Sequence, residues 1–196
     1  MMYFRYRHTN CFFVQSSGNG RLLAVDAGWP CTLYEYAGEM KKIGCRFEDV
    51  AWAMVTHFHM DHAGLVGEFV DRGIRCVVFE NQTDTADAME KTIRKNYSDY
   101  RLIAQSSLEQ VDSNDSKQFF QGIGIDGQVV VTDYHSPDSV TFITGAGEAI
   151  VGDLPPQGQM MPDDVRFAKN WKTIWNAGGR TAYPSHAEVF SLSDPT

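Results

Sequence analysis

Apolar and polar positions follow two different periods along this chain, and each period predicts one kind of element. Short runs rich in β-branched and aromatic residues predict strands at residues 11–14, 21–26, 50–55, 74–79, 128–133, 139–144, 148–152 and 181–183. Segments whose apolar residues recur at helical spacing predict helices at residues 32–43, 63–70, 81–96, about 117–121 and 162–176. Because strands and helices are interspersed along the chain, we expect a fold that contains both.

Glycine and proline mark several boundaries between these elements. Residues 16–20, Ser-Ser-Gly-Asn-Gly, predict a hairpin between the first two strands, and the Gly-Ala-Gly at residues 145–147 predicts another. Gly44 is placed to end one helix, and Pro162 to open the last one. The polar segment 81–96 has two interpretations, a solvated helix or a lid over a functional site.

Four potential metal ligands lie within six residues, between the predicted strand 50–55 and the predicted helix 63–70. They are His57, His59, Asp61 and His62. Imidazole nitrogen and carboxylate oxygen are ligands that zinc and similar ions prefer. Solvated loop histidines or one structural zinc would be alternatives, but the chain has only six histidines and three lie in this hexapeptide. We therefore expect a metal site on the turn after this strand, where α/β proteins usually place their chemistry.

Other polar residues also follow predicted strands. His135, Asp153 and His186 each lie in a loop after a strand, so five of the six histidines lie near strand ends. Asp26 ends the strand 21–26. It could cap the next helix, or it could orient a metal ligand through a hydrogen bond. His8 is the remaining histidine, and we interpret it as structural.

Together these residues resemble the motifs of the metallo-β-lactamase superfamily, in the dinuclear His-x-His-x-Asp-His branch that includes glyoxalase II, lactonases and RNase Z. The five motifs appear in the family's order between about residues 10 and 190: Asp26, the 57–62 motif, His135, Asp153 and His186. The resemblance implies a four-layer αββα sandwich of the α+β class, with metals at one edge of its two sheets. It also implies one metal on His57, His59 and His135, a second on Asp61, His62 and His186, and Asp153 as the bridge.

Ligand counting supports two ions, because seven ligands exceed the four that one tetrahedral zinc takes. We expect zinc, with manganese or iron as alternatives. Two cations would lower the pKa of a shared water, so that a metal-bridging hydroxide could attack a carbonyl or phosphoryl group at neutral pH. Asp61 and Asp153 are the expected catalytic carboxylates: Asp61 or the metal-bound water could handle the proton, and Asp153 would bridge the ions.

The sequence departs from the family pattern around two ligands. Tyr134 and Asp138 replace the glycines that often surround the third motif, and Ser185 and Ala187 flank His186. No ligand is lost, so these changes concern the shape of the substrate pocket. The phenol of Tyr134 could bind substrate by donating to an oxyanion; an ordinary packed tyrosine is the alternative.

Composition bounds the other properties. A chain of 196 residues predicts a single domain over residues 1–196, and 43% hydrophobic with 21% charged residues is ordinary globular composition. The net charge of −8 argues against nucleic acid as a partner. There is no long apolar run or signal-peptide pattern. The four cysteines have no paired spacing, so we expect reduced thiols and a cytoplasmic protein. The oligomeric state is left open, with a homodimer as one option.

Exclusion within the family narrows the function. No cysteine fits a zinc β-lactamase site, no basic arm for tRNA is present, and only ten residues follow His186, too few for the helical domain of glyoxalase II. We therefore expect a hydrolase for an ester, thioester, lactone or similar carbonyl compound of small size. A phosphodiesterase is one alternative, with Arg101, Lys169, Lys172 and Arg180 as candidate pocket cations. A metal-binding or ligand-sensing protein without activity is the other.

Overall fold

The fold of this protein, taken from a computed structural model that describes residues 1–83, 85–159, 161 and 163–195, is built on two β-sheets. The first has the order β1-β2-β3-β4-β5-β6 and the second the order β11-β10-β9-β8-β7. The strands of the first are Met2–Tyr6, Thr9–Gln15, Leu22–Val25, Val50–Met54, Arg75–Phe79 and Leu108–Val111, from β1 to β6. Those of the second are Gly127–Val131, Val140–Thr144, Glu148–Gly152, Thr181–Pro184 and Phe190–Ser191, from β7 to β11.

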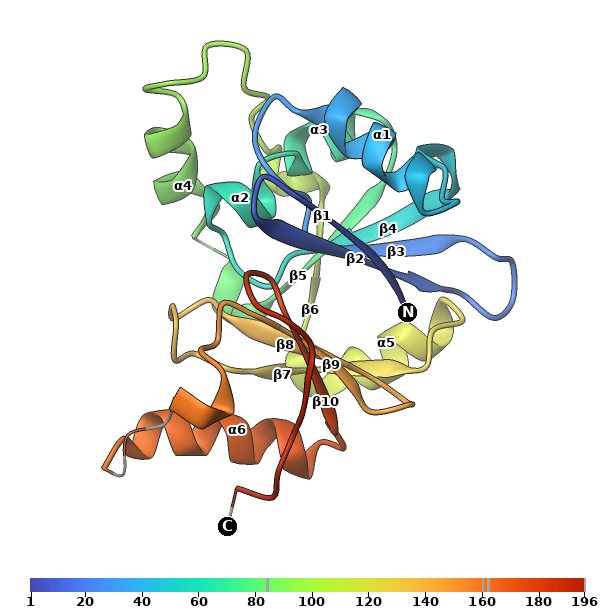
Figure 1. The fold of residues 1–196 in the computed structure, drawn as a ribbon. Coiled ribbons are helices and arrows are strands. Elements are labelled where there is room, and N and C mark those ends of the chain that lie inside the picture. The colour runs from blue at the N-terminus through green and yellow to red at the C-terminus, as the bar shows by residue number, and fades with distance from the viewer. Residues whose placement is uncertain (84, 160, 162, 196) are drawn as a thin grey trace.

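Helices cover the outer faces of both sheets (Figure 1). On the first sheet lie α1 (Leu33–Lys42), α2 (Met60–Ala63), α3 (Val66–Asp71) and α4 (Ala86–Ile93). On the second lies α6 (Val165–Asn176), and α5 (Ser116–Gly122) packs beside β7. The predicted αββα sandwich is therefore confirmed.

Three apolar clusters correspond to these layers. One joins the helices α1, α3 and α4 to the first sheet, around the fully buried Tyr36 and Phe69. The second lies between the sheets and includes Phe12 and Phe142. The third packs Trp171 of α6 on the second sheet. Burial of these large side chains is the main favourable term in folding, and it fixes both sheets relative to each other.

Most predicted elements are present within one to a few residues of their expected bounds, and both predicted hairpins form. The helix predicted at 63–70 is wrong in outline: it is two short helices, and α2 already begins at Met60. The helix predicted at 81–96 is shorter, since α4 spans Ala86–Ile93. The strands β1, β6 and β11 were not predicted. Asp84 and Pro162, within two predicted helices, lie outside the described residues.

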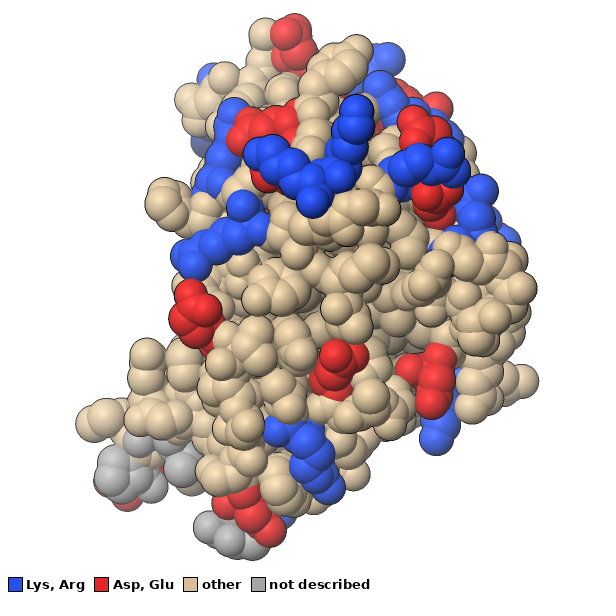
Figure 2. All heavy atoms as spheres, turned by 45° about the vertical axis from the view of Figure 1, so that its right-hand side comes forward, with Lys and Arg blue, Asp and Glu red and all other residues tan. Residues whose placement is uncertain are grey.

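Charged residues of both signs lie close together over the upper part of the face in Figure 2, so this part of the face presents no extended surface of one sign. Arg46 and Asp49, which follow α1, form one ion pair between charges of opposite sign. Within the described residues, no helix is both long and apolar enough to cross a membrane.

Candidate metal centre

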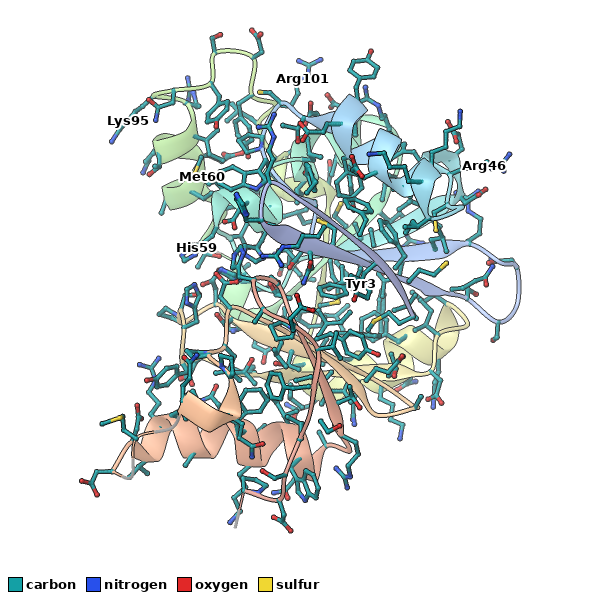
Figure 3. The ribbon with its side chains drawn as sticks, viewed as in Figure 1. Tyr3, Arg46, His59, Met60, Lys95 and Arg101 are labelled. Carbon is teal, nitrogen blue, oxygen red and sulfur yellow. The ribbon has the colours of Figure 1, made fainter. Side chains whose placement is uncertain are left out.

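The seven predicted ligands converge at the edge where the two sheets meet, each on a segment that follows a strand. His57 and His59 lie in the loop after β4, and Asp61 and His62 lie in the helix α2 that this loop enters. The second sheet supplies the other three, which follow β7, β9 and β10: His135, Asp153 and His186. Figure 3 shows His59 at this edge, with Met60 next to it on the side of α4.

One group of donor atoms comprises His57, His59, His135 and Asp153, all within 4.8 Å of one another. Nε2 of His57 lies 3.0 Å from Nδ1 of His59, which lies 3.2 Å from Nε2 of His135. Oδ2 of Asp153 lies 3.8 Å from Nε2 of His57 and 3.5 Å from Nε2 of His135. Four donors therefore face one small volume.

The second group comprises Asp61, His62 and His186. Oδ2 of Asp61 lies 3.4 Å from Nε2 of His62 and 3.1 Å from Nε2 of His186. Oδ1 of Asp153 lies 3.2 Å from each of these two nitrogens. The carboxylate of Asp153 thus turns one oxygen toward each group, which is the position that a bridging ligand needs.

Asp26 orients His62 from behind. Both side chains are fully buried, and Oδ2 of Asp26 lies 2.8 Å from Nδ1 of His62. The same carboxylate accepts hydrogen bonds from the backbone N–H of Thr56 at 2.7 Å and from the Ser185 hydroxyl at 3.3 Å. Because the helix α1 begins after Thr32, Asp26 does not cap it. The orienting interpretation therefore fits the structure.

The β1–β2 hairpin orients His186 and Asp61. Arg7 and His8 form its turn with left-handed backbone, φ of 47° and 72°. The backbone oxygen of His8 lies 2.8 Å from Nδ1 of His186, and the hydroxyl of the next residue, Thr9, donates to Oδ2 of Asp61 at 3.2 Å. His8 thus acts through its carbonyl, and Thr9 was missed because only the folded hairpin brings its hydroxyl to the site.

Two buried polar residues hold the loops that carry the ligands. Oδ2 of Asp138 accepts the N–H of Phe58 at 2.6 Å, and Oδ1 accepts the Ser136 hydroxyl at 2.7 Å. Gln82 donates to the backbone oxygen of Val55 at 3.0 Å and to that of Asp138 at 3.2 Å. Asp138, which replaces a glycine that the family often has here, therefore links the third-motif loop to the His57–His59 loop.

Four of the histidines at the centre divide into two pairs by the direction in which their pKa is shifted. Burial lowers the pKa of His57 to about 2, and burial also lowers the pKa of His135. Burial would lower the pKa of His62 too, but the carboxylates of Asp26 and Asp153 outweigh it and raise the pKa to about 10. The carboxylates of Asp153 and Asp61, whose oxygens lie 3.2 Å and 3.1 Å from Nε2 of His186, raise the pKa of His186 to about 10.

The two carboxylates of the centre remain ionised at neutral pH. Burial alone would raise the pKa of Asp61, but His186 and His62 outweigh it and lower the pKa to about 2. The pKa of Asp153 is held well below its usual range, because the same two histidines outweigh its burial. Two negative charges therefore lie among imidazoles at a site where cations would be stabilised.

This donor set fits divalent metal ions. Bonds of about 2.0–2.1 Å from an ion to nitrogen or oxygen place neighbouring tetrahedral ligands roughly 3.3 Å apart, close to the spacings in both groups. Nε2 of His62 and Oδ1 of Asp153 are buried without a hydrogen-bond partner of good geometry among the described residues. Unpartnered buried polar atoms are costly, and an ion between them would satisfy both.

Tyr134 does not present a free phenol. Its hydroxyl donates to Oδ2 of Asp164 at 2.7 Å, and its ring packs edge-on against Phe167 at 4.9 Å between centroids. Asp164 also accepts the N–H of Phe167 and so caps α6. This geometry favours the packed-tyrosine interpretation over binding of substrate.

Two cavities flank the ligands. A cavity of about 650 Å³ reaches His59 and Asp61 and has α4 as one wall. A cavity of about 300 Å³ reaches His135, Asp153 and His186. Because ligands from both groups border open space, a substrate could approach the centre. The segment 81–96 had two interpretations, a solvated helix or a lid. Its helix α4 forms one wall of the larger cavity.

Solved structures share this fold at low sequence identity. The protein TTHA1623 in a di-iron-bound form aligns with a TM-score of 0.65 and 17% identity, covering 97% of this chain and 93% of that one. A metallo-β-lactamase from Erythrobacter litoralis aligns with a TM-score of 0.68 and 17% identity, covering 97% and 85%. The mono-zinc form of the metallo-β-lactamase FIM-1 from Pseudomonas aeruginosa gives 0.65 and 15%, covering 96% and 83%.

The sequence itself matches a family. The profile of the metallo-beta-lactamase superfamily matches residues 5–186, a span that begins within β1, ends after β10 and contains all seven predicted ligands. The order of the strands, the convergence of the ligands and this match agree. The chain belongs to the metallo-beta-lactamase superfamily, which includes metal-dependent hydrolases.

Proposed function

We propose that this protein is a hydrolase that uses two divalent metal ions, zinc in the first instance, to cleave a carbonyl bond in a small substrate. The proposed substrates are esters, thioesters and lactones. The observation that carries the proposal is the position of Asp153, whose two oxygens face two separate groups of donors. A purely structural zinc site would need one closed set of four ligands.

The residues that would hold the ions follow from these groups. His57, His59 and His135 would hold one ion, while Asp61, His62 and His186 would hold the other. Divalent ions at these positions supply Lewis acidity, which lowers the pKa of water and polarises a carbonyl group. Asp26, Thr56 and the His8 carbonyl bind the far nitrogens of three imidazoles, and so direct the near nitrogens to the centre.

The overall reaction consumes one water. A bond forms between the water oxygen and the carbonyl carbon, and the bond from that carbon to the leaving oxygen or sulfur breaks. One water proton ends on the leaving group, and the other is lost when the carboxylic acid ionises. Asp61 is placed to accept the water proton and to pass it to the leaving group, since its carboxylate is ionised at neutral pH and borders the larger cavity.

The cavities favour a carbonyl substrate over a phosphodiester. Among the described residues that line either cavity, none is lysine or arginine. Arg101 instead pairs with Asp71, and Arg180 donates to backbone oxygens at the end of α6. Phosphate recognition usually relies on such cations.

Turnover of a substrate panel tests this proposal. A thioester, a lactone, a β-lactam and a phosphodiester would each be incubated with zinc-loaded protein and with chelator-treated protein. We expect chelator-sensitive cleavage of a carbonyl substrate, a loss of at least about 100-fold in Asp153→Ala, and near-normal activity in Asp115→Ala, an exposed position away from the centre. Selective cleavage of the phosphodiester would support the phosphodiesterase alternative. No turnover by protein that holds two ions would favour the non-catalytic alternative.

A further inference from the structure

The larger cavity is bounded on one side by a single stripe of α4. Ala88, Met89 and Thr92 of this helix line it, with Thr85 just before the helix start. Positions three and four apart share one face of a helix, so the stripe faces the cavity along the whole length of α4. Ile93 and Ala86 on another face are buried in the outer core cluster, which fixes the helix in place.

The cavity surface as a whole is predominantly apolar, and the described lining outside α4 lies on the metal loop and the third-motif loop. Phe58, Met60 and Pro137 contribute apolar surface, and Ser136 lies beside them. Methionine is unbranched and polarisable, so Met60 and Met89 can adapt to ligands of different shape. An apolar lining gains free energy when it covers apolar ligand surface in place of water.

The charged groups of the cavity disfavour an anionic ligand. Asp61 and Asp138 are the acidic lining residues, and no described lining residue is basic. Both oxygens of Asp138 accept hydrogen bonds from the protein, and Asp61 faces His62 and His186. On the side of the cavity away from the metal centre, along α4 and Pro137, a ligand carboxylate or phosphate would lose water and gain no cation among the described lining residues, which is costly.

The two cavities differ in size, and this difference indicates which cavity would take the larger group of a substrate. The larger one measures about 650 Å³ and the smaller one about 300 Å³. Ligand pockets of drug-sized molecules occupy about 300–1,000 Å³. The larger cavity can therefore take a group as large as an aryl ring or a medium alkyl chain, while the ligand atoms of the metal centre lie between the two cavities.

We propose that the substrate carries a bulky, uncharged, apolar group, aryl or medium-chain alkyl, that binds between α4 and the metal loop. This proposal rests on the hydrolase function proposed above, and it narrows the substrate class. The carbonyl group would lie at the mouth shared with His59 and Asp61, and the smaller portion of the substrate would extend toward Pro155 and Gln159. Ala88 is the specificity position, because its small side chain leaves the wall open.

A homologous substrate series tests the apolar group. The series would be S-methyl alkanethioates from acetyl to octanoyl for a thioesterase, or γ-alkyl butyrolactones from methyl to heptyl for a lactonase. We expect kcat/KM to rise about threefold to fourfold per buried CH₂ until the cavity is filled. A carboxylate at the chain end should lower kcat/KM at least about tenfold. Equal kcat/KM along the series, or a preference for the carboxylate, would overturn the proposal.

Two tryptophan variants test whether the chain-length preference arises in the cavity beside α4. Ala88→Trp narrows the cavity from an exposed position, and Asp87→Trp places the same side chain on the same helix but off the lining stripe. We expect Ala88→Trp to lower kcat/KM for the longest substrate at least about tenfold and to change the shortest by less than about twofold. Asp87→Trp should leave both unchanged. Equal effects of the two variants would count against the assigned cavity.

A binding assay separates this proposal from the hydrolase proposal. N-phenyl-1-naphthylamine is a neutral probe whose fluorescence rises in apolar pockets, and its binding needs no turnover. We expect saturable binding to the zinc-loaded wild type and to Asp87→Trp, weakened at least about tenfold in Ala88→Trp. Binding without turnover of any carbonyl substrate would refute the hydrolase function alone. Turnover without chain-length preference or probe binding would refute the apolar group alone.

Discussion

The carboxylate of Asp26 lies 2.8 Å from Nδ1 of His62, and both side chains are fully buried. Asp26 comes from the end of β3 and His62 from α2, so the contact joins the first sheet to the metal loop. It also fixes which imidazole nitrogen faces the centre: Nδ1 is held by Asp26, and Nε2 points toward Asp61 and Asp153. A carboxylate behind a histidine ligand both orients the ring and makes it a better donor.

Replacing Asp26 should weaken the second metal position most. Asp26→Asn keeps the shape and suits the left-handed backbone at this residue, where φ is 69°. We expect zinc affinity at this position to fall about 10- to 100-fold, measured by competition with a chromophoric chelator. Metal-free protein should lose about 3–5 kcal/mol of unfolding free energy, because a buried charge loses its partner.

The matched control is Asp71→Asn, which removes a carboxylate from an exposed pair with Arg101. Exposed ion pairs contribute about 0–1 kcal/mol, so its stability and zinc affinity should stay near those of the wild type. Equal zinc affinity in Asp26→Asn and the wild type would mean that Asp26 has no orienting role.

Gly64 allows the metal loop to pack against the segment after β3. A Cβ at this position would lie 2.5 Å from the backbone oxygen of Met60 and would also collide with Trp29 and Pro30. We expect Gly64→Ala to lower the unfolding free energy by about 2 kcal/mol or more. Gly38→Ala is the control, since nothing lies within 4 Å of a Cβ in that helical position, and it should stabilise by about 0.5–1 kcal/mol. Urea unfolding distinguishes the two, and equal effects would contradict the packing described.

The side chain of His8 should be dispensable, whereas the backbone conformation at this residue should not. Its carbonyl oxygen, 2.8 Å from His186, is the group that serves the centre, and its φ is 72°. We expect His8→Gly, which adopts this φ without strain, to keep zinc content and activity within about twofold. His8→Pro cannot adopt it and should lower zinc occupancy at the second position. Loss of zinc in His8→Gly, measured by elemental analysis, would show that the imidazole itself matters.

Zinc binding should release protons. The pKa values of His62 and His186 are raised to about 10 in the metal-free protein, so both imidazoles hold an extra proton at pH 7. Coordination needs the free nitrogen, so loading should release about two protons per chain, and affinity should rise with pH up to about 10. Calorimetry in buffers of different ionisation enthalpy measures the release. A release near zero at pH 7 would contradict the assigned protonation.

The convergence of the seven candidate ligands could be predicted because they lie near strand ends, where the apolar pattern is clear. Asp153 directly follows β9 and His186 follows β10 within two residues. Their orienting partners were harder to predict. Thr9, Ser185 and the His8 carbonyl reach the centre only through the hairpin and the packing of the two sheets, and no local pattern reports such contacts.

The missed elements also have physical reasons. The strand β6, Leu-Glu-Gln-Val, has no fully buried residue, so it lacks the apolar run that marks a strand. The strand β11 has only two residues. Strand β1, at the sheet edge beside β2, alternates in burial, with Phe4 and Tyr6 buried, but its sequence Met-Tyr-Phe-Arg-Tyr does not alternate between apolar and polar residues. The helix α2 begins inside the ligand motif, because the chain turns into a helix directly after His59.

The most direct measurement is a zinc titration of chelator-stripped protein, with hydrolysis of the best carbonyl substrate followed at each point. Two donor groups that share Asp153 predict that activity rises and reaches its plateau at two zinc ions per chain. Asp153→Ala should bind less zinc and remain inactive at any zinc concentration. A plateau at one ion, or no hydrolysis of any carbonyl substrate by protein that holds two, would contradict the dinuclear hydrolase.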